Sequence, residues 1–256
     1  MTLDIKRQEH LKTIRQYELQ QALKYFPTTG HILEIGAGSG WQAQWLNNHG
    51  YQVTAVDVPS SQYLQNRVFP IIVYDGLSLP FANHSFDIIF SSNVLEHIVN
   101  PTEFNKELKR VLRPDGIAIH IVPTSVWRFW TILTHHIYIL QLIINHLKNL
   151  FIDNKISYES YNVKNLSKIE IISRLLWPSR HGEQGTAISE LYSFSKKSWK
   201  IYFEKYDWKV RHCCPIGLFY TGNQIFHKKI NNSLRVKMSR FLGSSSIVFF
   251  LYLSEQ

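Results

Sequence analysis

A doubly wound α/β fold with a parallel central sheet is the fold class that this sequence predicts. Apolar strand-like runs alternate with helix-like segments from residue 31 to residue 122, as in a series of βαβ units. A glycine-rich turn follows the first run, and an acidic residue ends the second. The chain has 256 residues, a length that suits one large domain of this class or a core with an insertion.

The glycine-rich turn joins the apolar run His31-Ile32-Leu33 to a helix-like segment that begins at Trp41. Its glycines let the backbone pass close under a ligand, while the helix N-terminus offers free N–H groups and partial positive charge. The dinucleotide pattern G-x-G-x-x-G would need its third glycine where Trp41 stands, and the turn instead reads E-x-G-x-G-x-G. A tight turn without a ligand is the alternative. The expected nucleotide cradle consists of Glu34, Gly36, Ala37, Gly38 and Gly40.

Acidic residues end the next two strand-like runs. The run 51–57 ends at Asp57, about 20 residues after Gly36, which is the separation at which an acid meets ribose hydroxyls. An ionised carboxylate accepts hydrogen bonds from two adjacent hydroxyls, so we expect Asp57 and its neighbour Val58 at the ligand. The alternative for Asp57 is a solvated strand end. The run 69–76 ends in Asp75-Gly76, which taken alone is a turn signal.

A fourth run, Phe86–Phe90, and a fifth, Ile117–Val122, lie on either side of a helix that opens at Pro101. We expect the stretch Arg113-Pro114-Asp115-Gly116 to stop this helix. In open parallel sheets the ligand crevice lies at the carboxyl ends of the strands. The residues after the fourth run that are expected to border this crevice are Ser91, Ser92 and Asn93.

Four motifs occur in a fixed order: E-x-G-x-G-x-G, F-D-x-I, V-L-E-H and L-R-P-D-G. This order resembles the common small-molecule (type-11-like) branch of the class I S-adenosylmethionine (SAM)-dependent methyltransferases, over residues 31–123. The resemblance implies a seven-stranded Rossmann-like sheet of order 3-2-1-4-5-7-6, with strands six and seven near residues 207–212 and 246–253 and a helical insertion after strand five. It also implies SAM as the cofactor, with Asp75 at the adenine edge and Gly76 allowing close backbone approach.

We expect a single methyltransferase domain over residues 1–256. Its expected parts are an N-terminal helix (1–28), a SAM-binding half (29–123), a helical insertion or lid (124–191) and the C-terminal part of the sheet (192–256). Further helices are expected over residues 164–177 and 196–206, and a basic, turn-rich segment over residues 215–245.

The segment 125–152 is strongly apolar but carries too many polar residues for a transmembrane span. On a helix, polar residues such as Thr131, Thr134 and His135 share one arc, and apolar residues such as Leu133 and Ile137 share the other. Such an apolar face packs on the domain, lines a lid over an apolar substrate, or lies in a membrane interface. Packing on the domain is the default expectation.

Methyl transfer needs a nucleophile close to the methyl group and a group that removes the nucleophile's proton, where it has one. His97, in the V-L-E-H motif, is the first candidate for the base, because a histidine pKa near neutrality suits proton abstraction. His181 is the second, beside Glu183 in the polar loop 179–187. A structural role for His97 and a plain solvated loop stay open. No metal ligands stand at a recognisable spacing, so no metal site is predicted.

The net charge of +9 favours anionic partners, and the adjacent cysteines 213 and 214 suit a reducing, cytoplasmic compartment. The preferred interpretation is O-methylation of an amphiphilic or anionic small molecule, such as a lipid- or nucleotide-linked sugar in surface-polysaccharide assembly, with peripheral contact at the inner membrane face. The loop at His181 and the stretch 192–199 loosely resemble methyltransferases of that assembly. Alternatives are a small aromatic or quinone-like acceptor, a non-catalytic SAM-binding module and, least favoured, an RNA substrate.

Overall fold

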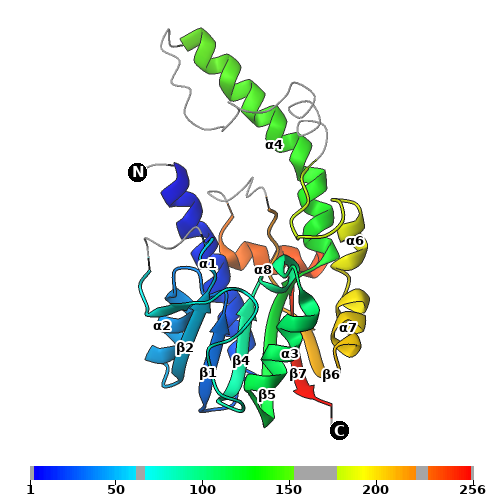
Figure 1. The fold of residues 1–256 in the computed structure, drawn as a ribbon. Helices are drawn as coiled ribbons and strands as arrows, with labels where there is room; N and C mark the ends of the chain where they lie inside the picture. The colour runs from blue at the N-terminus through cyan, green and yellow to red at the C-terminus, as the bar shows by residue number, and fades with distance from the viewer. Residues whose placement is uncertain (1–2, 62–66, 153–177, 223–229, 255–256) are drawn as a thin grey trace.

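The computed structural model describes residues 3–61, 67–152, 178–222 and 230–254. It contains one seven-stranded sheet of order β3-β2-β1-β4-β5-β7-β6, in which β7 runs antiparallel to both of its neighbours (Figure 1). The strand order and the doubly wound fold class predicted above are confirmed. The strands are β1 His31–Ile35, β2 Gln52–Asp57, β3 Ile71–Val73, β4 Phe86–Ser92, β5 Leu112–Pro123, β6 Trp208–Pro215 and β7 Ser246–Leu253.

The helices lie between these strands in the order typical of alternating α/β connections. Several begin with local signals in the sequence: Asn100 accepts a hydrogen bond from the Glu103 amide and precedes Pro101 at the start of α3. The described helices are α1 Leu3–Leu23, α2 Trp41–Asn48, the 3-10 turn η1 Leu95–His97, α3 Pro101–Val111, α4 Ser125–Ile152, α6 Ser189–Ser193, α7 Lys196–Lys205 and α8 Asn232–Leu242.

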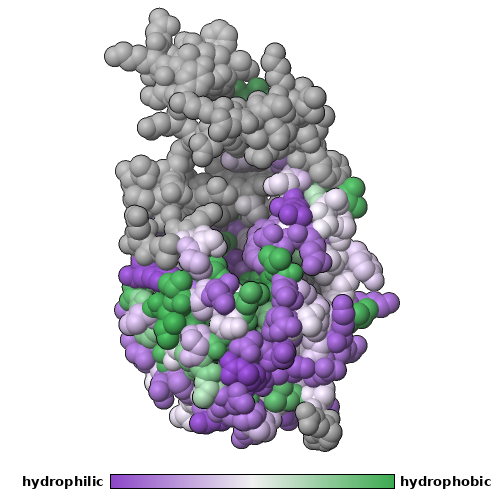
Figure 2. Space-filling model, viewed as in Figure 1, coloured by the Kyte–Doolittle hydropathy of each residue, from purple (hydrophilic) through white to green (hydrophobic). Residues whose placement is uncertain are grey.

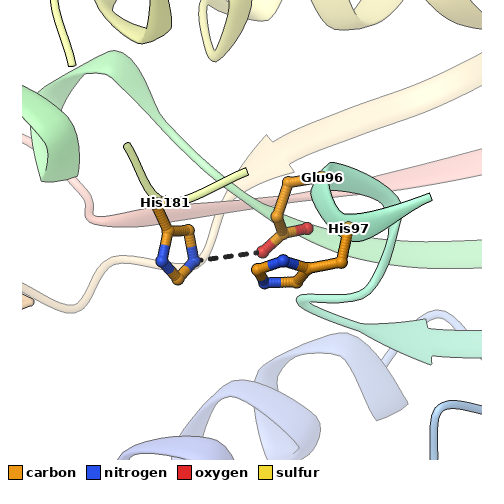
Figure 3. Close-up of side chains that lie close together, drawn as sticks. All are labelled: Glu96, His97 and His181. Atoms are coloured by element: carbon orange, nitrogen blue, oxygen red, sulfur yellow. Dashed lines mark ion pairs between the residues drawn. The ribbon is translucent and has the colours of Figure 1, made fainter. Parts of the chain in front are cut away.

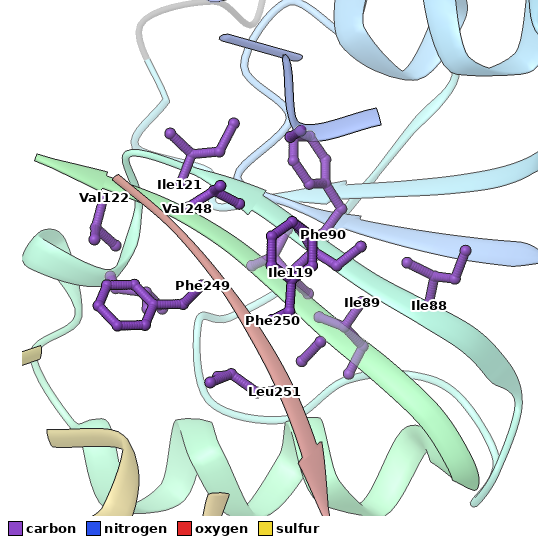
Figure 4. Packing of buried hydrophobic residues seen from close by; sticks show 14 of the residues in the cluster. Ile88, Ile89, Phe90, Ile119, Ile121, Val122, Val248, Phe249, Phe250 and Leu251 are labelled. Atoms are coloured by element: carbon purple, nitrogen blue, oxygen red, sulfur yellow. The ribbon is translucent and has the colours of Figure 1, made fainter. Parts of the chain in front are cut away.

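The core lies along the central strands, whose residues are buried on both faces of the sheet as in parallel sheets covered by helices. Figure 4 shows Phe90 of β4, Ile119 of β5 and Phe250 of β7 within one apolar cluster. Hydrophilic residues cover much of the outer face in Figure 2, where hydrophobic residues form separate small patches. The buried strands bring the carboxyl ends of β1, β2 and β4 to one edge of the sheet.

Helix α3 ends at Val111, just before the stretch Arg113–Gly116 that was expected to stop it. This stretch belongs to β5: Phe86 pairs with Leu112 and the pairing resumes at Ile88 with Ile117, so the extra residues form a bulge. One expectation is corrected. The segment 215–245 contains α8, which the sequence suggested only as a turn-rich region. The Asn231 side chain caps α8 by accepting from the Leu234 amide. The predicted helix 164–177 lies outside the described residues.

Helix α4 buries its polar arc and exposes its apolar arc, which is the reverse of the default expectation. Thr131, Thr134 and His135 of the polar arc are buried, and the Thr131 hydroxyl accepts a hydrogen bond from the Gly222 amide at 2.8 Å. Apolar residues of the other arc are between 41% and 56% exposed: Phe129, Leu133, Ile137, Leu140, Ile143 and Ile144. Packing of this apolar arc on the domain is therefore excluded for these residues. None of the helices in the described ranges is long and apolar enough to cross a membrane.

Candidate active site

The glycine-rich turn between β1 and α2 needs glycine for both conformation and space. Gly36, Gly38 and Gly40 all adopt positive φ angles, of 68°, 58° and 80°. A Cβ atom on Gly36 would lie 2.5 Å from a methyl carbon of Val94, and one on Gly40 would lie 2.8 Å from Phe69. Because Val94 precedes η1, the close approach at Gly36 brings the turn after β4 against the glycine turn.

The amides of this turn are already hydrogen-bonded inside the protein. Those of Gly36 and Ala37 donate to the carbonyl of Val56 in β2, at 2.9 and 3.1 Å. The Gly38 amide donates to the Asp57 carboxylate at 3.0 Å. A phosphate cradle needs free backbone N–H groups, so these three amides do not provide one. The turn instead offers a bare backbone surface that suits a ligand without phosphate groups.

Asp57 lies at the carboxyl end of β2, where the sequence predicted it, and is buried. One of its oxygens accepts from the Gly38 amide and the other accepts from the Val58 amide at 2.9 Å. These bonds fix the carboxylate against the glycine turn. A carboxylate oxygen accepts more than one hydrogen bond, so Asp57 keeps acceptor capacity for ligand hydroxyls.

Glu34 carries a carboxylate that the protein leaves incompletely paired. The residue is buried in β1, and among the described residues its Oε2 atom has no hydrogen-bond partner. Burial, with a further contribution from the nearby Asp57 charge, raises the pKa of Glu34 to about 8. A buried carboxylate with a free oxygen next to the glycine turn fits a cationic ligand group.

The other predicted ligand residues lie nearby with differing surroundings. Asp75 is exposed, and the amides of Leu77 and Ser78 donate to its Oδ1 at 2.8 Å, which lowers the pKa of Asp75. Ser91 is fully buried with its hydroxyl 2.7 Å from Nδ1 of His120, whose pKa burial lowers to about 3. Ser91 is thus part of the buried core of the sheet. Three other residues predicted to contact the ligand are partly exposed: Gly76, Ser92 and Asn93.

The candidate bases come together in space with a residue that the sequence reading missed. His97 on η1 and His181 on the loop before α6 have ring centroids 4.9 Å apart, and Glu96 lies beside both (Figure 3). Nε2 of His181 is 3.6 Å from Oε1 of Glu96, and Nδ1 of His97 is 3.9 Å from Oε1 of Glu183. Glu96 stands in the V-L-E-H motif, but only the fold reveals that a distant loop reaches it.

The loop that carries His181 is held against η1 by its backbone. The Glu183 amide donates to the Glu96 carbonyl at 2.9 Å, and a Cβ atom on Gly182 would lie 2.7 Å from that same oxygen. Glycine at position 182 is thus required for this close approach. The ring of Trp127, at the base of α4, lies 4.6 Å from the ring of His181 and packs the loop from the other side.

A buried ion pair anchors the loop from beneath. Oε1 of Glu190 accepts from the amides of His181 and Gly182, both at 2.7 Å. Oε2 of Glu190 is 2.9 Å from Nε of Arg128 on α4, and both side chains are buried. Arg128 also donates to the carbonyl of Ser179 at 2.7 Å. The orientation of His181 therefore depends on a charge pair that water does not reach.

Part of this chain is similar to known methyltransferases. Residues 33–120 match a family of methyltransferase domains. An uncharacterized methyltransferase of Mycolicibacterium paratuberculosis is 32% identical over 104 residues, which cover 38% of this chain and 39% of that protein. One from Mycobacterium leprae is 31% identical over 108 residues, covering 40% and 39%. The chain thus matches about two fifths of the length of these curated relatives.

Solved structures share the whole fold at low sequence identity. A SAM-dependent methyltransferase from Mesorhizobium loti has a TM-score of 0.52 at 13% identity, with 92% of this chain and 97% of that chain covered. One from Aquifex aeolicus has a TM-score of 0.50 at 14% identity, with 92% and 91% covered. Residues 33–120 are thus similar to methyltransferase domains, and the strand order of the sheet is the one that the resemblance to the class I SAM-dependent type implied.

We expect the replacement Glu34→Gln to stabilise the ligand-free protein at pH 8. The folded state holds a proton on Glu34 that the unfolded chain releases above its ordinary pKa of 4.5, so wild-type stability falls as pH rises from 4.5 to 8, by on the order of 1 kcal/mol per pH unit. Glutamine has no such penalty. The difference in free energy of unfolding, measured by urea denaturation, should vanish near pH 4.5.

The matched control is Glu18→Gln. Glu18 is also buried, but it pairs with Arg15 at 2.6 Å and accepts a hydrogen bond from the Tyr220 hydroxyl. This control should destabilise the protein at both pH values. A loss of stability on Glu34→Gln at pH 8 would contradict the assignment of Glu34 as an unpaired buried acid.

We expect Arg128→Met to lower the free energy of unfolding by about 3–5 kcal/mol, because it leaves the Glu190 carboxylate buried without its counter-charge. The control is Lys109→Met, which breaks the solvent-exposed pair with Asp207 at 3.1 Å and should cost no more than about 1 kcal/mol. Equal losses for the two variants, in urea denaturation at neutral pH, would show that the buried pair does not anchor the loop.

Proposed function

We propose that this protein transfers a methyl group from SAM to a small-molecule acceptor. The observation that carries the proposal is the glycine turn with its own amides satisfied and a buried, incompletely paired Glu34 beside it. SAM has an adenosine without phosphate and a methionine end with a positive ammonium group. It therefore matches both the bare backbone surface and the unpaired carboxylate.

Residues of this chain have distinct places in the proposed SAM complex. Asp57, fixed by two backbone amides, accepts from the ribose hydroxyls, and Glu34 accepts from the methionine ammonium. Asp75 and Gly76 border the adenine, and Ser92 and Asn93 border the methionine end. When bound, SAM supplies an electrophilic methyl group on a positively charged sulfur. The protein's share is to orient that methyl group toward an acceptor and exclude other partners.

The acceptor's reacting end is proposed to lie at the cluster formed by Glu96, His97 and His181, with Glu183 beside it. Val94, which contacts the glycine turn, accepts the His97 amide at 2.9 Å. One turn of backbone thus links the SAM cradle to the imidazole of His97. This proximity supports a role for His97, His181 or Glu183 in orienting the acceptor or taking up its proton.

For the acceptor we propose an amphiphilic, anionic molecule such as a lipid- or nucleotide-linked sugar, methylated on oxygen. The exposed apolar arc of α4 supports this proposal, as does an open hollow of about 480 Å³ at its base lined by Phe129, Trp130 and Phe241. Phe241 is 90% exposed, and the exposed cations Lys237 and Arg240 precede it on α8. An apolar surface beside cations favours an anionic membrane surface as the place where the acceptor is met.

Calorimetric titration should show that the protein binds SAM and its demethylated product, S-adenosylhomocysteine. Asp57→Asn removes charge at the ribose contact while keeping an oxygen for one backbone amide, and it should weaken SAM binding by about 1.5–3 kcal/mol. The control Asp115→Asn changes an exposed acid in the β5 bulge and should leave the affinity unchanged. The proposed function fails if a folded preparation binds neither compound.

In a flotation assay the protein should rise with vesicles of anionic phosphatidylglycerol and stay behind with neutral phosphatidylcholine. The double replacement Leu133→Glu and Ile137→Glu places charge on the exposed arc of α4 and should abolish flotation. The control Ile201→Glu changes an equally exposed apolar residue on α7 and should float as the wild type does. If the wild-type protein does not float with anionic vesicles, the result favours the alternative acceptor, a small aromatic or quinone-like molecule.

A further inference from the structure

The carboxylate of Glu96 is the unexplained group of this site. The side chain is fully buried, and within the described ranges neither of its oxygens has a hydrogen-bond partner. Its backbone is occupied, since its carbonyl accepts the Glu183 amide. A buried carboxylate without hydrogen bonds is costly for a fold to maintain. The imidazoles of His97 and His181, which lie next to this carboxylate, indicate what would compensate that cost.

The imidazole of His181 faces the Glu96 carboxylate at a distance longer than a hydrogen bond. Nε2 of His181 stands 3.6 Å from Oε1 of Glu96, whereas an N–H···O hydrogen bond spans about 2.7–3.2 Å. Two ligands on one tetrahedral zinc ion, each bound at about 2.0–2.1 Å, lie about 3.4 Å apart. The 3.6 Å separation of these two atoms is close to that of two ligands on a common ion.

We propose that Glu96, His97 and His181 form a binding site for a divalent transition-metal ion of the zinc type. One ligand atom from each of the three lies within 4.8 Å of the other two. The His97 side chain is 41% exposed, so its ring has room to rotate toward the other two ligands. Two imidazoles and one carboxylate are the donor set of open zinc sites, whereas magnesium and calcium prefer oxygen ligands alone.

Neighbouring residues fix the orientation of these ligands, as the residues around a metal site do. Glu183 lies 3.9 Å from Nδ1 of His97, close enough to orient that ring after a small adjustment. The Glu190 carboxylate fixes the backbone of His181, and Trp127 packs against its ring. Figure 3 shows His181 reaching Glu96 from the separate loop while His97 comes from η1 itself. The sequence predicted no metal site because these ligands come from two distant segments.

An ion with three protein ligands keeps a position open for a fourth. On the proposed function, that position takes an oxygen or nitrogen atom of the acceptor and places it next to the methyl donor. The metal site thereby assigns the acceptor a specific chemical feature, a lone pair that a zinc-type ion binds. The cluster's role is then to hold the acceptor.

The test is titration of the chelator-treated full chain with Zn²⁺ alone, followed by calorimetry, and with Co²⁺, followed by visible absorption. We expect one Zn²⁺ per chain and the intense Co²⁺ bands of a protein-bound, low-coordinate ion, with no binding of Mg²⁺. Glu96→Gln and His181→Ala should each weaken Zn²⁺ binding at least about tenfold. His136→Ala, which changes an exposed histidine of α4, controls for adventitious binding and should have no effect.

Stability provides a second readout. Glu96→Gln is isosteric and removes a buried carboxyl group whose oxygens accept no hydrogen bond, so the metal-free variant should melt at or above the wild-type temperature. Zn²⁺ should raise the melting temperature of the wild type and not that of the variant. If Glu96→Gln does not fold, the half-exposed His97→Ala is the replacement variant and should show the same loss of Zn²⁺ binding.

SAM titration of the same samples separates this inference from the proposed function. Zn²⁺ binding that is absent, or equal in the wild type, Glu96→Gln and His181→Ala, would overturn the metal site. SAM binding would then still support the methyltransferase. The reverse result, Zn²⁺ binding at these ligands without SAM binding, would leave the metal site standing and remove its proposed role.

Discussion

The need of a buried carboxylate for a counter-charge organises this molecule. Four glutamates are buried in the described part of the chain: Glu18, Glu34, Glu96 and Glu190. Glu18 and Glu190 each pair with an arginine and accept further hydrogen bonds, and they hold helices and a loop in place. Glu34 and Glu96 have buried oxygens that accept no hydrogen bond and, among the described residues, neither pairs with an arginine. Because a buried carboxyl group without such partners is costly, we propose that ligands complete these two sites.

The cradle was predictable because its signals are local. The alternating glycines specify a turn of positive φ angles, and Asp57 ends β2 as expected from its distance to Gly36 along the chain. Whether a glycine turn binds an anion cannot be predicted from local sequence, because it depends on which backbone amides stay free of hydrogen bonds. The Val56 carbonyl in the neighbouring strand takes two of them. Sequence spacing therefore predicted the glycine turn and the acid at the end of β2, whereas the sheet register determines which amides of the turn stay free.

The second half of the chain was less predictable because its interactions are long-range. Strand β7 has the range that was expected for it. A mostly apolar run of eight residues is too short for a typical helix and is most simply a buried strand. Helix α8 was missed because the segment was interpreted as basic and turn-rich, whereas in the fold Arg235 is buried and its guanidinium donates to the Phe219 carbonyl. Glu96 was passed over for the same reason: its meaning depends on His181, which the Glu190 anchor carries to it.

Helix α4 shows how far periodicity alone can determine orientation. Its two arcs were correctly separated by sequence, yet Thr131 and Thr134 face inward, where their hydroxyls bond to backbone carbonyls of the same helix. Those bonds satisfy the hydroxyls without water, so burying this arc costs little. The exposed apolar arc, with residues such as Leu140, then has no stability role in the domain. This exposed apolar arc is therefore the part of α4 on which the proposed amphiphilic acceptor depends.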